Sequence, residues 1–178
     1  LKVLSIKDKV PSLTGIFTFE HVTNARHWKE VLIQGSVSRL PEVRETAAKI
    51  RSHDVVTIIY TSGTTGRPKG VMLTHANLLA NIRAMGEAIG VTSSDVFVSW
   101  LPLYHDMGLI GAWLGSLYQA FPLVVMSPLA FLSRPQCWLW AIHRHRGTIS
   151  AAPNFAYELC LKKIEDRDIE GIDLSSWR

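Results

Sequence analysis

The strongest constraint on the fold is an alternation of strand-like and helix-like segments along the chain. Residues 55–60 (VVTIIY) form a β-branched run without polar alternation, which predicts a strand covered on both faces. Further strands are predicted at 71–73, 96–101, 121–126 and 148–151. Apolar residues at helical spacing predict helices at 75–88, 107–120, 135–146 and from 154 onward. This order predicts an α/β fold with a largely parallel sheet flanked by helices.

Single residues predict where these helices end and which faces they bury. The helix at 75–88 should bury the face that carries Leu78, Ile82, Met85 and Ile89. Gly147 is expected to end the helix that begins at Pro135, and Asn154 to cap the last helix. In the first fifty residues, a helix is expected at 25–33, ending at Gly35, whereas 41–51 fits either a helix or an extended chain.

Composition and charge narrow the functional classes. The 47% hydrophobic content of the 178 residues is typical of a globular protein with a core. Nineteen basic against fifteen acidic residues give a net charge of +4, a mild excess that suits a polyanionic small molecule and does not indicate nucleic acid. Cys137 and Cys160 have no metal-ligand spacing. We therefore expect two reduced thiols, no metal site in the chain and a cytoplasmic protein.

A long uncharged segment, residues 107–133, could by length alone span a bilayer. Pro122 and Pro128 interrupt it, and it divides into a predicted helix and a predicted strand. We expect no transmembrane span, and peripheral membrane contact is left open. Gly111 and Gly115 should instead let the helix lie close to the sheet. The chain begins at Leu1 without methionine, so we expect it to be part of a longer protein.

The most informative motif is the polar loop YTSGTTGRPKG at residues 60–70. Its hydroxyl side chains are those of Thr61, Ser62, Thr64 and Thr65, and its glycines are Gly63, Gly66 and Gly70. Glycines let backbone N–H groups turn toward an anion, and Lys69 adds a mobile positive charge. The loop predicts a polyphosphate site. It is not a Walker A loop, which requires GxxxxGK[ST]; the alternative is a surface turn with an incidental lysine.

This loop closely resembles the signature loop of the acyl-adenylate-forming superfamily. The superfamily includes acyl-CoA synthetases, fatty acyl-AMP ligases, luciferases and peptide-synthetase adenylation domains, and the likeness is firm from Asp54 to Arg178. The resemblance implies a site that holds the β- and γ-phosphates of ATP while a carboxylate attacks the α-phosphate. The residues implied for this site are Thr61, Ser62, Gly63, Thr64, Thr65, Gly66 and Lys69. Lys69 would be catalytic through positioning and charge neutralisation, not as a nucleophile.

Two further motifs extend the resemblance. In LPLYHDMG (101–108), His105 would be catalytic and line the pocket where carboxylate meets ATP, beside Asp106; an oriented structural histidine is the alternative. Met107 and Gly108 would begin the wall of an acyl tunnel.

The third motif, AAPNFAYE (151–158), resembles a fatty acyl-AMP ligase segment beside the substrate pocket, which implies substrate contacts for Asn154 and Phe155. Many of those ligases have two glycines where Ala151 and Ala152 stand here, and the extra methyl groups could narrow the passage. The cations at 143–146 fit better as complements to a helix dipole than as a phosphate contact.

The resemblance as a whole implies residues 1–178 to be part of an AMP-binding N-terminal domain, with 1–53 as a less defined lead-in. The main Mg²⁺ ligand, the ribose motif and the C-terminal domain with its catalytic lysine would come after Arg178, so this segment alone should be inactive. The implied activity is ATP-dependent activation of a fatty acid with release of pyrophosphate. Of the two possible acceptors of the acyl group, CoA is preferred to a carrier protein. A non-catalytic nucleotide-binding module and a phosphotransferase are the alternatives from other classes.

Overall fold

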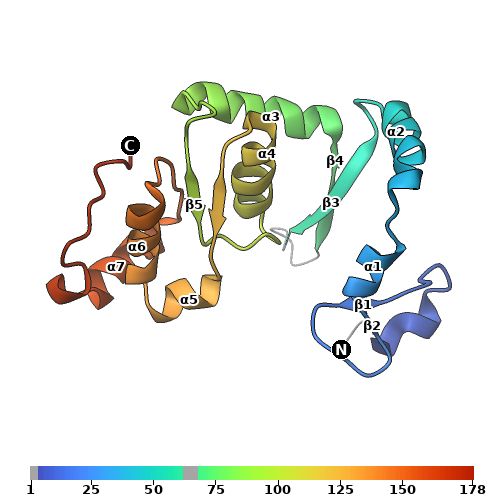
Figure 1. Cartoon of the computed structure of the whole chain (residues 1–178), viewed down its shortest axis with the longest axis horizontal. Coiled ribbons are helices and arrows are strands. Elements are labelled where there is room, and N and C mark those ends of the chain that lie inside the picture. The colour runs from blue at the N-terminus through green and yellow to red at the C-terminus, as the bar shows by residue number, and fades with distance from the viewer. Residues whose placement is uncertain (1–3, 62–67) are drawn as a thin grey trace. The chain divides into compact units, whose positions relative to one another are not determined.

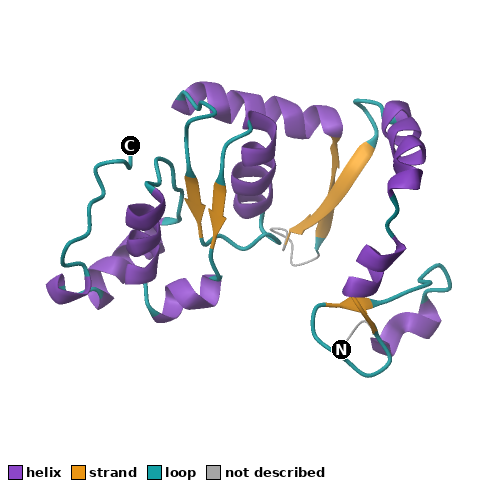
Figure 2. Cartoon of the chain, viewed as in Figure 1, coloured by secondary structure: helices purple, strands orange, loops and turns teal. Residues whose placement is uncertain are grey.

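A computed structural model describes residues 4–61 and 68–178 of the chain (Figures 1 and 2). The chain divides into two compact units, Leu1–Ile50 and Arg51–Arg178. Helices account for more of each unit than strands do, and the strands form two-stranded sheets.

The first unit is built from short elements: η1 (Leu4–Lys9), β1 (Phe17–Thr18), β2 (Arg26–His27), α1 (Lys29–Gln34), η2 (Val37–Arg39) and α2 (Leu40–Lys49). Strands β1 and β2 pair in parallel, with Phe17 opposite Arg26. The predicted helix at 25–33 is shorter than expected because β2 occupies its first residues, and Gly35 follows its last turn as expected. The segment at 41–51, for which two conformations were open, is a helix.

In the second unit, β3 (Val55–Thr61) and β4 (Lys69–Thr74) form an antiparallel hairpin. The prediction that 55–60 is covered on both faces is wrong, because Thr57 and Ile59 are half-buried while Val56 and Ile58 on the other face are 42% and 50% exposed. A continuous apolar run favours burial of both faces of a strand. It does not show that a covering layer exists.

The parallel pairing lies around β5 (Phe97–Ser99). Strand β6 (Leu123–Val125) pairs with it in parallel on one side, and Ile149 makes a parallel bridge to Phe97 on the other. The strand expected at 148–151 is thus reduced to one bridge. The α/β fold class is confirmed, with parallel pairing at β5 and antiparallel pairing in the hairpin.

The helices of the second unit are α3 (His75–Ile89), η3 (Met107–Leu114), α4 (Gly115–Gln119), α5 (Pro128–Ser133), α6 (Gln136–His145), α7 (Asn154–Lys163) and η4 (Asp166–Asp168). The segment predicted as a helix at 107–120 is helical, with η3 wound as a π-helix and continued by α4. Helix α5 was not predicted. Among the residues described, no helix has both the length and the apolar character needed to cross a bilayer.

Several expected helix features are corrected. Arg146, and not Gly147, takes the left-handed conformation after α6, with φ of 51°. A Cβ on Gly147 would lie 2.6 Å from Val98 Cγ2, so this glycine permits close approach to β5. Asn154 is the first residue of α7 and does not cap it, because Pro153 takes the cap position.

The buried face of α3 is also narrower than predicted. Leu78 and Ile82 are buried, but Met85 and Ile89 are 36% and 49% exposed. Gly111 has open space around it, whereas a Cβ on Gly108 would collide with the Pro102 carbonyl oxygen. The close packing of the helix that was expected at Gly111 and Gly115 is therefore found at Gly108, which lies against the Pro102 carbonyl.

The main core is aromatic and lies between β5 and helices α5, α6 and α7. Trp100 stacks on Phe131 with ring centroids 4.0 Å apart, and Trp138 meets Trp100 edge-on. Trp138 Nε1 donates a hydrogen bond to Ser150 Oγ over 2.9 Å. Trp100 Nε1 is buried and has no hydrogen-bond partner among the described residues.

Candidate active site

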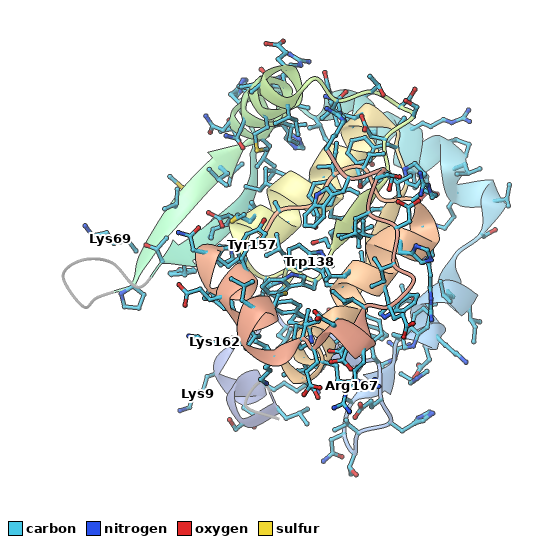
Figure 3. The ribbon with its side chains drawn as sticks, turned by 90° about the vertical axis from the view of Figure 1, so that its left-hand side faces the viewer. Lys9, Lys69, Trp138, Tyr157, Lys162 and Arg167 are labelled. Atoms are coloured by element: carbon cyan, nitrogen blue, oxygen red, sulfur yellow. The ribbon has the colours of Figure 1, made fainter. Side chains whose placement is uncertain are left out.

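The polar loop motif lies at the turn of the β3–β4 hairpin. The ladder places Thr61 directly opposite Lys69, so the two ends of the motif meet. Both residues are exposed, and Figure 3 shows Lys69 at the end of the hairpin, well away from Trp138 and Tyr157. The remaining predicted phosphate contacts lie outside the described residues: Ser62, Gly63, Thr64, Thr65 and Gly66.

The second motif lies between β5 and η3, with His105 and Asp106 immediately before the helix. His105 Nδ1 lies 2.7 Å from Asp106 Oδ1, and both side chains are more than half exposed. Asp106 Oδ1 also accepts a hydrogen bond from the backbone N–H of Met107 over 2.7 Å, which caps η3. The Asp106 carboxylate therefore orients the His105 imidazole, and the backbone N–H at the start of η3 holds this carboxylate in place.

One cavity of about 1010 Å³ connects the two motifs. Its wall includes Thr61 from the end of β3 and Asp106 and Met107 from the start of η3. Lys69, His105 and Gly108 are not among the described residues that form the wall. Apolar residues from β3, β4, α3 and η3 make up most of the remainder: Ile59, Val71, Leu73, Leu78, Ile82, Met85 and Ile110.

The cavity extends from the loop end of the hairpin to α3. Strand β4 runs from Lys69 at the loop to Thr74, where α3 begins. Helix η3 begins within the second motif and continues into α4, which lies beside α3 (Figure 1). At the end of α4, Gln119 lies against Gly86 of α3. Both walls therefore run in the same direction, with polar Thr61 and Asp106 at the loop end and mostly apolar side chains beyond them.

The third motif contributes to the wall through its first residue. Ala151 lines the cavity and also packs against both hydrophobic cores. Asn154 and Phe155 lie at the start of α7 and are exposed, and the Phe155 ring meets Trp100 with centroids 6.0 Å apart. Ala151, which stands where many fatty acyl-AMP ligases have glycine, therefore places its methyl group in the cavity wall. The substrate contacts expected of Asn154 and Phe155 stay a prediction.

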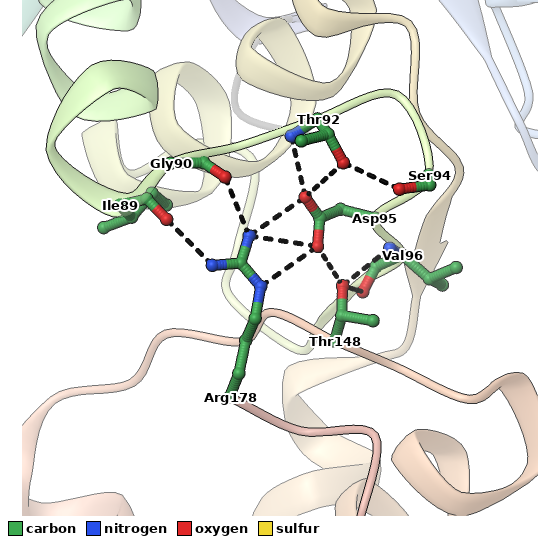
Figure 4. A network of polar contacts seen from close by, with 8 residues as sticks. All are labelled: Ile89, Gly90, Thr92, Ser94, Asp95, Val96, Thr148 and Arg178. Carbon is green, nitrogen blue, oxygen red and sulfur yellow. Dashed lines mark hydrogen bonds and ion pairs between the residues drawn. The ribbon is translucent and has the colours of Figure 1, made fainter.

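A buried carboxylate that sequence reasoning missed lies where the cavity meets the end of α3. Asp95 accepts hydrogen bonds from the Thr92 backbone N–H over 2.8 Å and from Thr148 Oγ1 over 2.7 Å (Figure 4). Arg178 Nη2 lies 3.0 Å from Asp95 Oδ2. Burial favours the neutral acid, but the hydrogen bonds from Thr148, Arg178 and Thr92 outweigh it and lower the pKa of Asp95 to about 2.

Arg178 joins three segments at this point. Besides Asp95, its guanidinium donates to the carbonyl oxygens of Ile89 over 2.9 Å and Gly90 over 3.2 Å, which are exposed at the end of α3. A cation at a helix C-terminus also complements the helix dipole. Because Asp95 and Arg178 are 83 positions apart, no local pattern in the sequence signals the pair.

Basic residues near the end of α6 have a structural role. Arg146 Nη1 lies 2.6 Å from Asp173 Oδ2, and His143 Nδ1 accepts the Asp173 backbone N–H over 3.0 Å. Hydrogen bonds from Ser175 and the pairing with Arg146 lower the pKa of Asp173 to about 2. These contacts hold the last residues of the chain against α6.

The described residues do not assemble a magnesium site. No group of three metal-ligating side chains comes together in the part of the chain described. Asp106 is the single carboxylate among the described residues of the cavity wall, and His105 and the Met107 N–H already bind it. Because Mg²⁺ takes carboxylates together with substrate phosphates, Asp106 by itself does not make a binding site for this ion.

The chain is similar to proteins of known activity. A medium-chain-fatty-acid–[acyl-carrier-protein] ligase, TtuA of Teredinibacter turnerae, is 48% identical over 124 residues, which cover 70% of this chain and 19% of that protein. A putative fatty-acid–CoA ligase of Mycobacterium tuberculosis is 46% identical over 123 residues, covering 66% of this chain and 21% of the relative. The chain therefore spans about a fifth of the length of the relatives it matches.

Solved structures agree with this likeness. A fatty acyl-adenylate ligase from L. pneumophila, solved in complex with acyl adenylate and pyrophosphate, superposes with a TM-score of 0.70 at 45% identity over 72% of this chain and 23% of that one. A second structure, McyG A-PCP with phenylalanyl-adenylate, covers 99% of this chain and 26% of its own with a TM-score of 0.71 at 24% identity, which shows the fold alone. The sequence model described as "AMP-binding enzyme" matches residues 3–178, and the chain belongs to this family of AMP-binding enzymes.

Proposed function

We propose that the protein carrying this chain activates a medium- or long-chain fatty acid with ATP. A carboxylate oxygen attacks the α-phosphorus, a new oxygen–phosphorus bond forms, and the bond to the bridging oxygen of pyrophosphate breaks. The observation that carries the proposal is the single cavity that includes Thr61 at the end of the phosphate loop motif and Asp106 of the second motif. Its apolar interior beyond these residues suits an alkyl chain.

The roles of the individual residues follow from position and charge. We infer that Thr61, Ser62, Gly63, Thr64, Thr65 and Gly66 bind the β- and γ-phosphates of ATP. Lys69 neutralises charge on the departing pyrophosphate, because its ammonium group is a mobile point charge at the end of the loop motif. His105, oriented by Asp106, contacts the carboxylate and the α-phosphate.

The acyl chain is assigned to the apolar part of the cavity. Met107 lines the wall next to Asp106, and Gly108 lets the helix start closely against the Pro102 carbonyl. Asn154 and Phe155 are assigned to the substrate side on the resemblance of their motif alone. Mg²⁺ would accompany ATP, with its main ligand outside the residues described, and residues 1–178 by themselves are expected not to catalyse the reaction.

The acyl acceptor has two candidates. The phosphate loop resembles that of long-chain acyl-CoA synthetases, which favours CoA. Two relatives, at 48% and 46% identity, are medium-chain-fatty-acid–[acyl-carrier-protein] ligases, which favours a carrier protein as a second candidate. We further propose a cytoplasmic location, because Cys137 and Cys160 are free thiols and free thiols are usual in reducing compartments.

The test is product analysis with ATP, Mg²⁺ and dodecanoate, in separate reactions without acceptor, with CoA and with a phosphopantetheinylated carrier protein. Acyl-AMP and pyrophosphate should form in all three, and the thioester should appear with one acceptor. ADP as the product would refute adenylation in favour of phosphotransfer. Nucleotide binding without ATP–pyrophosphate exchange would instead indicate a non-catalytic module.

A further inference from the structure

The end of the cavity farthest from the phosphate loop is not purely apolar. Gln119, the last residue of α4, lines the cavity together with Met85, Ile89 and Phe121. It is half-buried and lies against Gly86 of α3, at the opposite end of the continuous helix η3–α4 from Asp106. Water can reach this half-buried amide while the cavity is empty. An acyl chain that fills the cavity would displace that water and leave the amide unpaired unless the chain carries a hydrogen-bonding group.

A glycine within α3 makes room for this amide. A Cβ on Gly86 would collide with Gln119 Nε2, so the amide nitrogen lies directly against the backbone of the helix. Glycine in the interior of a helix is less favourable than alanine. The position therefore gives up helix stability, and the structure shows that the space it frees is occupied by the Gln119 amide.

The other half-buried or capping polar groups of the wall are already in use. Asn77 bonds to Thr74, Ser150 to Trp138 and Asp106 to Met107. Thr61 and Asn81 are exposed to water. Within the described part of the chain, the Gln119 amide has no hydrogen-bond partner, although it can donate two hydrogen bonds and accept two. The unused capacity faces the space that the proposed function assigns to the acyl chain.

We propose that Gln119 is a specificity-determining residue that recognises a hydrogen-bonding substituent on the distal part of the acyl chain. The substrate class is then a medium- or long-chain fatty acid carrying a hydroxyl or oxo group toward its ω-end, with its carboxylate at the Thr61 and Asp106 end. This inference rests on the proposed adenylation of fatty acids. A site that bonds a substrate hydroxyl discriminates against the analogue that lacks it, because the protein group is then left unpaired.

The experiment measures kcat/KM for pyrophosphate release with two matched series, from octanoate to hexadecanoate and the corresponding ω-hydroxy acids. For each chain length, the ratio of the hydroxylated to the unsubstituted acid is compared between the wild-type protein and the Gln119→Leu variant. Loss of one hydrogen bond with a net value of about 1 kcal/mol corresponds to about a fivefold change in this ratio. Wild type should favour the hydroxylated acid at one or two chain lengths, and Gln119→Leu should lower that ratio about fivefold.

Two further variants make the result specific. Gly86→Ala should displace the amide and lower the same ratio, whereas Gln34→Leu, an exposed amide on α1, should leave it unchanged. A general loss of stability affects both acids equally and cancels in the ratio. Equal ratios for wild type and Gln119→Leu at every chain length would overturn the inference while leaving adenylation intact. If neither series is activated, the proposed function fails as well.

Discussion

Replacing the buried carboxylate by its neutral isostere, Asp95→Asn, should destabilise the second unit in a pH-dependent way. The pKa of Asp95 is lowered from 3.8 to about 2 in the folded protein. Each pKa unit corresponds to about 1.36 kcal/mol, so ionisation of this group stabilises the fold by about 2 kcal/mol at neutral pH. The side chain is only 5% exposed, so solvent screening subtracts little from this value.

The sign and the pH window follow from the two pKa values. A carboxyl group with a lowered folded-state pKa stabilises the fold above its unfolded-state pKa, and this contribution disappears as pH falls through the folded-state value. The contribution of Asp95 should therefore be complete above about pH 4–5 and lost by about pH 2.

The assay is urea unfolding followed by tryptophan fluorescence, at a series of pH values, for wild type, Asp95→Asn and the control Asp173→Asn. Asp173 also has a pKa near 2 and pairs with Arg146, but its side chain is 52% exposed. Exposed ion pairs contribute little, so the control should lose much less stability. The reasoning is refuted if the difference between wild type and Asp95→Asn does not change between pH 7 and pH 3, or if Asp173→Asn is equally destabilised.

Three further outcomes are expected. Trp138→Phe should destabilise the fold by about 2 kcal/mol more than Trp100→Phe, because only Trp138 loses a hydrogen bond while Trp100 loses a buried donor without a described partner; equal losses in urea unfolding would contradict this. Lys69→Ala should lower the rate of ATP–pyrophosphate exchange by an amount equivalent to about 1.5–3 kcal/mol, and an unchanged rate would remove Lys69 from the site. Gly108→Ala should lower the free energy of unfolding by about 1–3 kcal/mol through collision with a backbone carbonyl, whereas Gly111→Ala, with open space around it, should be neutral or stabilising; equal losses for the two variants in urea unfolding would contradict this.

Local patterns in the sequence predicted most of the elements of the second unit. The strands at 55–60 and 71–73, helix α3, the helical segment at 107–120 and strand β5 follow from periodicity and from turn residues. The antiparallel pairing of the first two strands into a hairpin was not predicted. The cap of α3, which was not predicted, also has a local origin, since Thr74 and Asn77 form a reciprocal capping box. The predictions of these elements succeeded because each depends on residues within one or two turns of each other.

Features that depend on distant contacts were not predictable in this way. The exposure of Val56 and Ile58 depends on whether another layer covers β3, which the strand itself does not encode. Gly147 was predicted to end the helix, but Arg146 takes the left-handed conformation there. The absence of a side chain at Gly147 instead lets Val98 pack closely against it. Gln119 could be predicted to lie on a helix, yet its position against Gly86 is a property of how two helices pack.

The residues of the candidate site also differ in whether a short stretch of sequence could identify them. The loop motif and the His105–Asp106 pair were identified from short strings of residues, and one described residue of each, Thr61 and Asp106, lies in the wall of the same cavity. The cavity itself, and the presence of Ala151 in its wall, required the three-dimensional arrangement. Asp95 and Arg178, which join the end of α3 to the last residue of the chain, could not be paired from sequence.

The long separation between Asp95 and Arg178 also sets an order of events during protein synthesis. The ribosome adds roughly 5–20 residues per second, so the 83 positions between the two residues correspond to roughly 4–17 s of elongation. During this interval Asp95 has no guanidinium partner, and a carboxylate without an opposite charge resists burial even where hydrogen bonds such as that from the Thr92 N–H are available. The end of α3 and the strand after it should therefore stay loosely docked on the nascent chain until Arg178 leaves the exit tunnel, and only then can this part of the fold close.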